Sequence, residues 1–157
     1  MATEKLDLSL RLRHDDADLT SMARQLGLKA TVCWKKGDAR HAPDGTVLNG
    51  IRDSSYCSMS LDTGSIADLE EGLSECLKKL KPKERELRNF VLSGGTASIA
   101  VGWFCSGDTG DRIPEAVITE LANLRLTVDF YLYFATKRES KRQPSKRAAR
   151  NSPRDRL

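Results

Sequence analysis

A chain of 157 residues is long enough for one domain that buries its own core, without a disulfide or a metal to hold it together. Its formal charge of +4 is a property of one segment: residues 137–157 hold nine Lys or Arg and two acids, which leaves −3 for residues 1–136. The chain has neither a secretory signal nor an apolar run of about 18 residues, so we expect a soluble, cytoplasmic protein without a membrane partner.

The first elements follow from simple patterns. The leucines of residues 6–12 alternate with polar residues, which predicts a half-buried strand. Asp15 or Asp16 can cap a helix over 17–26, and Gly27 ends that helix.

The middle of the chain contains a long segment without periodicity. Residues 36–53 are rich in Gly, Pro and Asp, which predicts an exposed loop or hairpin excursion. A helix over 66–80 follows, with Thr63 or Ser65 as its cap. The complete set of expected elements is strands over 6–14, 29–35, 56–61, 96–105 and 126–134, and helices over 17–26, 66–80, 83–92 and 114–123.

The order of these elements predicts the fold class. Residues 6–35 and 96–134 share one plan of strand, turn, helix and strand, which is a weak internal repeat. We predict an α+β fold with a mainly antiparallel five-stranded sheet, helices on one face and a ferredoxin-like character. Residues 1–136 form this single domain, and residues 137–157 are expected to be a disordered basic tail.

The cysteines do not indicate a metal or redox site. Cys33, Cys57, Cys76 and Cys105 match no zinc, redox or haem spacing. We therefore expect free thiols in a reducing compartment, and we predict no cofactor and no metal.

Three stretches together resemble a known family over about residues 6–134. They are Leu26-Gly27-Leu28, the segment from Cys33 to Asp38, and Gly102-Trp103-Phe104 through Gly107 to the final strand Leu-Thr-Val-Asp-Phe-Tyr-Leu-Tyr-Phe. The chain resembles an uncharacterised, largely bacterial family, domain of unknown function 4279. The resemblance implies a small accessory protein without an established enzymatic activity, and for some members the neutralisation of toxins in bacterial competition.

The first group of candidate ligand-binding residues lies where the second strand meets the long loop. Trp34, Lys36, Asp38, Arg40 and His41 would bring an aromatic face, cations and a carboxylate to one place. A plainer interpretation is structural: the tryptophan packs at the sheet edge and the aspartate closes a turn.

A second group follows the fourth strand. Residues 106–112 could bind an anion through loop amides, or a hard cation through Asp108 and Asp111. A connecting turn with Asp111 near a helix cap explains the same residues. Trp103, from the third resembling stretch, completes the candidate ligand-binding set, which contains no catalytic residue and no metal ligand.

Three functions remain open. A folded body without a catalytic constellation favours a protein-binding or accessory module, which could be toxin-neutralising, with a protein partner or a second copy of the chain at an exposed strand edge. The first alternative is a small-ligand or metal-dependent enzyme, if loops 36–41 and 106–112 converge. The second is weak nucleic-acid binding through the basic tail.

Overall fold

The computed structural model of the chain describes residues 5–61, 63, 64, 66 and 68–135. The tail predicted over residues 137–157 lies outside the described residues. No helix in the described part of the chain is both long enough and apolar enough to cross a membrane.

The described residues form one five-stranded sheet, a separate two-stranded hairpin and four α-helices, with a short 3-10 helix between two of them. In chain order the elements are β1 (Lys5–His14), α1 (Leu19–Leu26), β2 (Ala30–Trp34), β3 (Ala39–His41), β4 (Val47–Ile51), β5 (Ser55–Ser60), α2 (Leu69–Leu80), η1 (Lys81–Lys83), α3 (Glu84–Leu92), β6 (Thr96–Cys105), α4 (Glu115–Asn123) and β7 (Leu126–Phe134).

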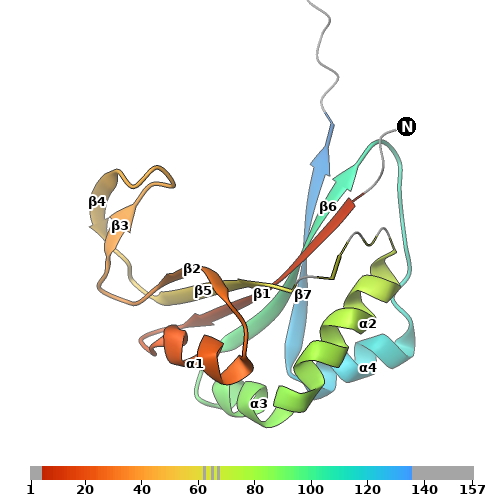
Figure 1. The fold of residues 1–157 in the computed structure, drawn as a ribbon, viewed down its shortest axis with the longest axis horizontal. Coiled ribbons are helices and arrows are strands. Elements are labelled where there is room, and N and C mark those ends of the chain that lie inside the picture. The colour runs from red at the N-terminus through yellow and green to blue at the C-terminus, as the bar shows by residue number, and fades with distance from the viewer. Residues whose placement is uncertain (1–4, 62, 65, 67, 136–157) are drawn as a thin grey trace, which may run out of the picture.

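The sheet has the strand order β2-β5-β1-β6-β7 (Figure 1). β1 pairs antiparallel with both β5 and β6, β2 pairs antiparallel with β5, and β6 pairs parallel with β7. Strands β2, β5, β1 and β6 therefore have the order and directions of a ferredoxin-like βαββαβ unit. α4 and β7 extend this unit by one parallel strand. This confirms the predicted fold class, a mostly antiparallel α+β sheet.

The predicted internal repeat is visible in the exits from two helices. α1 leads into β2 through Gly27, and α4 leads into β7 through Arg125. Both residues have left-handed backbone angles, with φ of 68° at Gly27 and 58° at Arg125. The two βαβ units therefore turn in the same way, although β5 separates the strands of the first unit and the strands of the second are neighbours.

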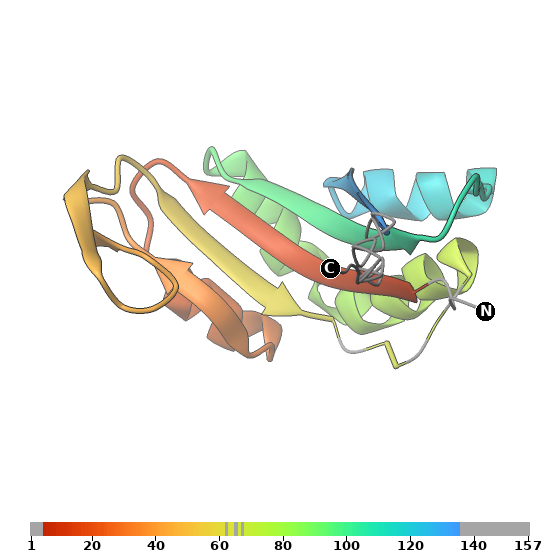
Figure 2. The same cartoon turned by 90° about the horizontal axis from the view of Figure 1, so that it is seen from above.

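The helices cover one face of the sheet and leave the other open. Figure 2 looks onto the open face and shows the helices behind the sheet. The four leucines of β1, Leu6, Leu8, Leu10 and Leu12, point to the helices and are at most 2 % exposed. Alternation along β1 therefore places the polar residues between them on the open face.

Both predicted helix caps need correction. Asp18, and not Asp15 or Asp16, caps α1: its Oδ1 accepts a hydrogen bond from the Thr20 amide at 3.0 Å, and this bond lowers the pKa of the carboxyl. The helix therefore begins at Leu19. An acid two residues closer to the first apolar turn is better placed to reach an unpaired amide.

The same change applies to α2. Its cap is Asp68, whose Oδ1 accepts from the Glu71 amide at 2.9 Å, so the helix begins at Leu69 and not at residue 66. Thr63 is not the cap, and the other predicted candidate, Ser65, lies outside the described residues.

The segment predicted as a loop or hairpin excursion is a hairpin. Within residues 36–53, β3 and β4 pair with each other and join no other described strand. The hairpin stands beyond the end of β2, on the side of the sheet away from the helices (Figure 1). It therefore borders the open face.

Candidate functional site

A cation–aromatic row, in which two aromatic rings lie between two arginines, crosses the open face near the hairpin. Arg13 lies opposite Tyr56, and Tyr56 lies opposite Trp34, in the registers of β1 with β5 and of β5 with β2. The Arg13 guanidinium carbon is 4.8 Å from the Tyr56 ring centroid, and the Tyr56 and Trp34 centroids are 4.6 Å apart. Arg52, from the connection between β4 and β5, places its guanidinium carbon 3.7 Å from the Trp34 centroid. Each ring is thus stacked against a cation.

A second contact links the centre of this face to the last strand. The Arg11 guanidinium carbon lies 4.7 Å from the centroid of Tyr131 on β7. β6 separates β1 from β7, so the arginine side chain must pass over it. Ala100 and Gly102 are the open-face residues of β6 beside this path, and their small size leaves room for the arginine.

The arginines of this face have unused hydrogen-bonding capacity. None of the ion pairs among the described residues involves Arg11, Arg13 or Arg52. The Nε atoms of Arg11 and Arg52 are buried without a hydrogen-bond partner in the described part of the chain. Stacking occupies the plane of a guanidinium and not its N–H groups, so the terminal Nη groups can still donate to a carboxylate or a phosphate.

A pocket of about 780 Å³ lies between the hairpin and the edge of β2. Trp34, Asp38, His41 and Arg52 contribute to its lining. Three of these four belong to the first group of residues predicted from the sequence. The pocket shares Trp34 and Arg52 with the cation–aromatic row, so the two features form one continuous surface.

Two members of that predicted group do not line the pocket. Lys36 is exposed beside it, and Arg40 donates from Nη1 to the Asn49 carbonyl across the hairpin at 3.4 Å. Asp38 also has a structural role, because its Oδ2 accepts a hydrogen bond from the Lys35 amide at 2.8 Å. This is the turn-closing role that the plainer interpretation predicted.

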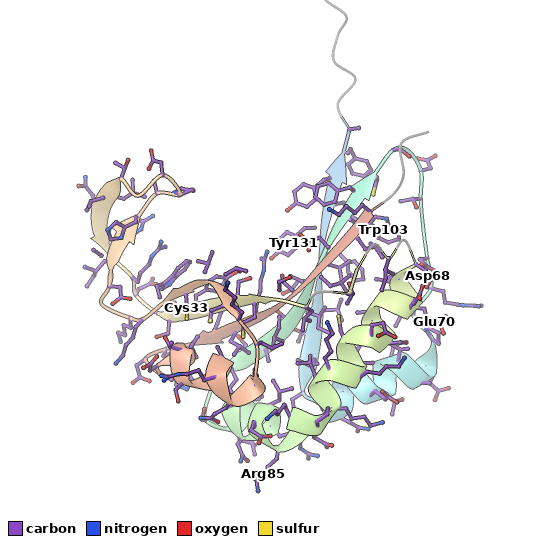
Figure 3. All side chains as sticks on the ribbon, viewed as in Figure 1. Cys33, Asp68, Glu70, Arg85, Trp103 and Tyr131 are labelled. Atoms are coloured by element: carbon purple, nitrogen blue, oxygen red, sulfur yellow. The ribbon has the colours of Figure 1, made fainter. Side chains whose placement is uncertain are left out.

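The second predicted group lies elsewhere. Trp103 is 7 % exposed and belongs to the core, and Figure 3 shows it on the side of α2 while Tyr131 lies on the open side. Residues 106–112 follow the end of β6. β2 ends at the opposite end of the sheet, where β6 starts, because Trp34, Tyr56, Arg13 and Thr96 follow one another across the strands. The two predicted loops are therefore separated by about the length of β6, roughly 30 Å. The carboxylates of Asp38 and Asp108 therefore do not converge.

Asp111 has a capping role, but for a different helix from the one that follows it. Its Oδ2 accepts a hydrogen bond at 2.9 Å from the amide of Leu69, the first residue of α2. In the described residues no three His, Cys, Asp or Glu side chains gather as a metal site would require.

Sequence reasoning missed most of the cation–aromatic contacts of the open face. Arg11 and Arg13 alternate with the buried leucines of β1, so the pattern alone assigns them to the opposite face. Tyr56, Arg52 and Tyr131 carry no such signal, because their meeting with the arginines depends on pairing between distant strands.

The comparison with known families fits the extent of this fold. Residues 4–135 match the family model described as a domain of unknown function, DUF4279. The chain belongs to this family. The match includes every strand and helix of the DUF4279 domain described above, and it confirms the resemblance found in the sequence. Searches of the curated proteins and of the solved structures each found no match.

Proposed function

We propose that this DUF4279 domain is a protein-binding module whose open face binds an acidic surface of a partner protein. The observation that carries the proposal is the set of three arginines, Arg11, Arg13 and Arg52, held on aromatic rings without ion-pair partners in the described residues. Stacking fixes each guanidinium in advance, so less side-chain entropy is lost when a carboxylate binds. The adjoining hairpin pocket would receive a side chain of the same partner.

The ring contacts favour a protein over a single-stranded nucleic acid. Proteins that bind single strands offer free ring faces on which bases stack. Here Trp34 lies between Tyr56 and Arg52, and Tyr131 lies under Arg11. Tyr133 is stacked on Phe104, with centroids 4.9 Å apart. Binding through the basic tail would be a separate activity, and it rests on residues outside the described part of the chain.

The geometry gives the enzyme alternative less support. That hypothesis required the carboxylates of residues 36–41 and 106–112 to share one pocket, and the two loops lie at opposite ends of the sheet. The binding proposal needs no such convergence.

The family resemblance, which implies the neutralisation of toxins for some members, makes a toxin one candidate partner for this surface. A neutralising protein acts by covering a functional surface of the toxin. A preformed cationic face is suited to cover such a surface where that surface is acidic. The four free cysteines fit a reducing compartment, so we include a cytoplasmic location in the proposal.

The proposal can be tested by capture from a lysate of the source cell. The full chain is immobilised, and proteins retained in stoichiometric amount after nuclease treatment are identified by mass spectrometry. We expect a double variant, Arg11→Gln with Arg13→Gln, to lose the partner, because both guanidinium edges disappear while much of each side-chain stem remains.

The matched control is Arg85→Gln. Arg85 is an exposed arginine of α3 on the helix side of the molecule (Figure 3), and it should not affect capture. Equal capture by the double variant, or no stoichiometric protein at all, contradicts the proposal. Capture that nuclease abolishes supports nucleic-acid binding instead.

A further inference from the structure

The last strand of the sheet is exposed along its edge and on both faces. From Asp129 to Phe134 every residue of β7 is exposed. Five consecutive large side chains lie in this segment, with exposures from 39 % at Tyr131 to 63 % at Phe134; they are Phe130, Tyr131, Leu132, Tyr133 and Phe134. β7 pairs only with β6 among the described strands, so its other edge has no partner strand.

The opposite edge of the same sheet is protected in the usual ways. β2 has five residues and its register is interrupted by an irregularity between Ala30 and Val32. Short strands and bulges are devices that prevent edge strands from pairing with other chains. β7 is nine residues long and its register with β6 is regular, so neither a short length nor a bulge protects its edge. Asp129 is its one charged residue.

We infer that β7 is the interface of a homodimer, in which the β7 strands of two copies pair antiparallel across a two-fold axis. The two five-stranded sheets then become one continuous sheet. Tyr131 belongs to both proposals because it also holds Arg11. The dimer depends on the edge and the apolar side chains of β7 and not on the arginines of the open face, so the two proposals can be tested separately.

The composition of β7 suits a second copy of the same strand. In a pairing centred on Tyr131, Phe130 lies opposite Leu132 of the second copy, and Asp129 lies opposite Tyr133 of the second copy. Aromatic–aliphatic cross-strand pairs stabilise sheets, and this register keeps the two Asp129 carboxylates apart. A two-fold axis also makes the contact close on itself, which prevents an open-ended assembly.

The apolar area of β7 can reach the lower bound for a specific interface. A fully buried aromatic side chain removes about 150–250 Å² from solvent. The five large side chains of β7 are roughly half exposed, so covering them would bury on the order of 500 Å² per copy and 1,000 Å² in total, the lower bound for a specific interface. Ile118 of α4, the helix that packs against β7, is also about half exposed and adds apolar area beside the strand.

The chain's own C-terminal segment is a poor alternative cover. Residues 137–157 contain no aromatic residue and a single large aliphatic residue, Leu157, whereas nine are Lys or Arg. Such a segment cannot supply the apolar cross-strand neighbours that the side chains of β7 require.

The test is the oligomeric state of the full chain, measured by sedimentation equilibrium up to about 100 μM, a concentration that would reveal a micromolar dimer. We expect a dimer for the natural chain. Leu132→Lys and Phe134→Lys should each raise the dissociation constant of the dimer by about ten-fold or more, because each puts an ammonium group in an apolar row. Both positions are at least half exposed in the single chain. Circular dichroism checks that both variants fold.

The control is Val47→Lys, which changes an even more exposed apolar residue on the hairpin and should leave the dimer intact. A natural chain that is monomeric throughout, or a dimer that neither β7 variant weakens, overturns the inference. Loss of the dimer in Val47→Lys alone also overturns it. The double variant Arg11→Gln with Arg13→Gln should remain a dimer even if it loses its partner protein, which separates the two proposals.

Discussion

The ring of Phe90 occupies the space that a side chain at Gly95 would need. A β-carbon built at Gly95 would lie 2.5 Å from both Cε1 and Cζ of Phe90. The Gly95 amide also donates a hydrogen bond to the Phe90 carbonyl at 3.1 Å, so the chain turns tightly from α3 into β6 over a core residue that is 7 % exposed. Glycine is therefore required here by space and not by its backbone angles.

Replacing this glycine should destabilise the domain. Gly95→Ala forces either the Phe90 ring or the start of β6 to move, and overpacking of this kind costs about 1–3 kcal/mol. Urea unfolding followed by circular dichroism measures the loss. Gly107→Ala is the control, since a β-carbon there meets nothing within 4 Å. Equal stability of the two variants would show that Phe90 can move at no cost.

Asp111 should contribute to stability although it lies far along the chain from the helix that it caps. Its carboxylate accepts a hydrogen bond from the Leu69 amide at 2.9 Å, and the Asp68 carboxylate accepts one from the Glu71 amide. The two acids therefore satisfy different amides of α2. We expect Asp111→Ala to lower the free energy of unfolding by about 1 kcal/mol, the usual effect of losing a cap.

Asp108→Ala provides the comparison for this prediction. Asp108 is an exposed acid of the same loop, and replacing it changes the charge by the same amount. Thermal unfolding of the two variants should therefore differ. If both lose the same stability, the effect comes from net charge and not from the cap.

Local patterns in the sequence were enough to predict the five strands of the sheet, but not β3 and β4 of the hairpin. Ile99, Val101 and Trp103 alternate with smaller residues along β6, and this pattern is typical of a strand that buries the tryptophan, as the structure does. Its inclusion among ligand-binding candidates rested on a motif and ignored that pattern. The alternation in β1 likewise assigns Arg11 and Arg13 to the open face.

Contacts between distant segments could not be predicted in this way. Asp15, Asp16 and Asp18 are equally suitable as caps by residue type, so only the backbone decides between them. The contact of Arg52 with Trp34 depends on how the hairpin returns to the sheet. The edge position of β7 is also a property of strand order, because its sequence is equally compatible with a central strand.

The four free cysteines should differ sharply in reactivity. Cys33 is exposed, whereas Cys57, Cys76 and Cys105 are buried. Burial, and then the neighbouring Cys33 thiol, raise the pKa of Cys57 to about 12, so its reactive thiolate is scarce. At neutral pH a maleimide should modify one thiol per folded chain, as counted by mass spectrometry. Cys33→Ser should abolish this labelling, and rapid modification of a second site would contradict the buried positions of the others.

Burial of Cys76 should make the domain less stable in alkali. Its thiol is fully buried, which raises its pKa from 9.0 to about 12. Above pH 9 the unfolded chain releases this proton while the folded chain retains it, so the stabilisation is complete below pH 9 and is lost progressively toward pH 12. The free energy of unfolding should fall more steeply with pH in the natural chain than in Cys76→Ala, by up to about 1.4 kcal/mol per pH unit.

Lysines and tyrosines titrate in both proteins, and the cavity left by the substitution gives a constant offset, so the difference in slope isolates the thiol. Parallel curves between pH 9 and 12 would mean that the thiol ionises equally in both states, which its burial between α2 and the sheet does not allow.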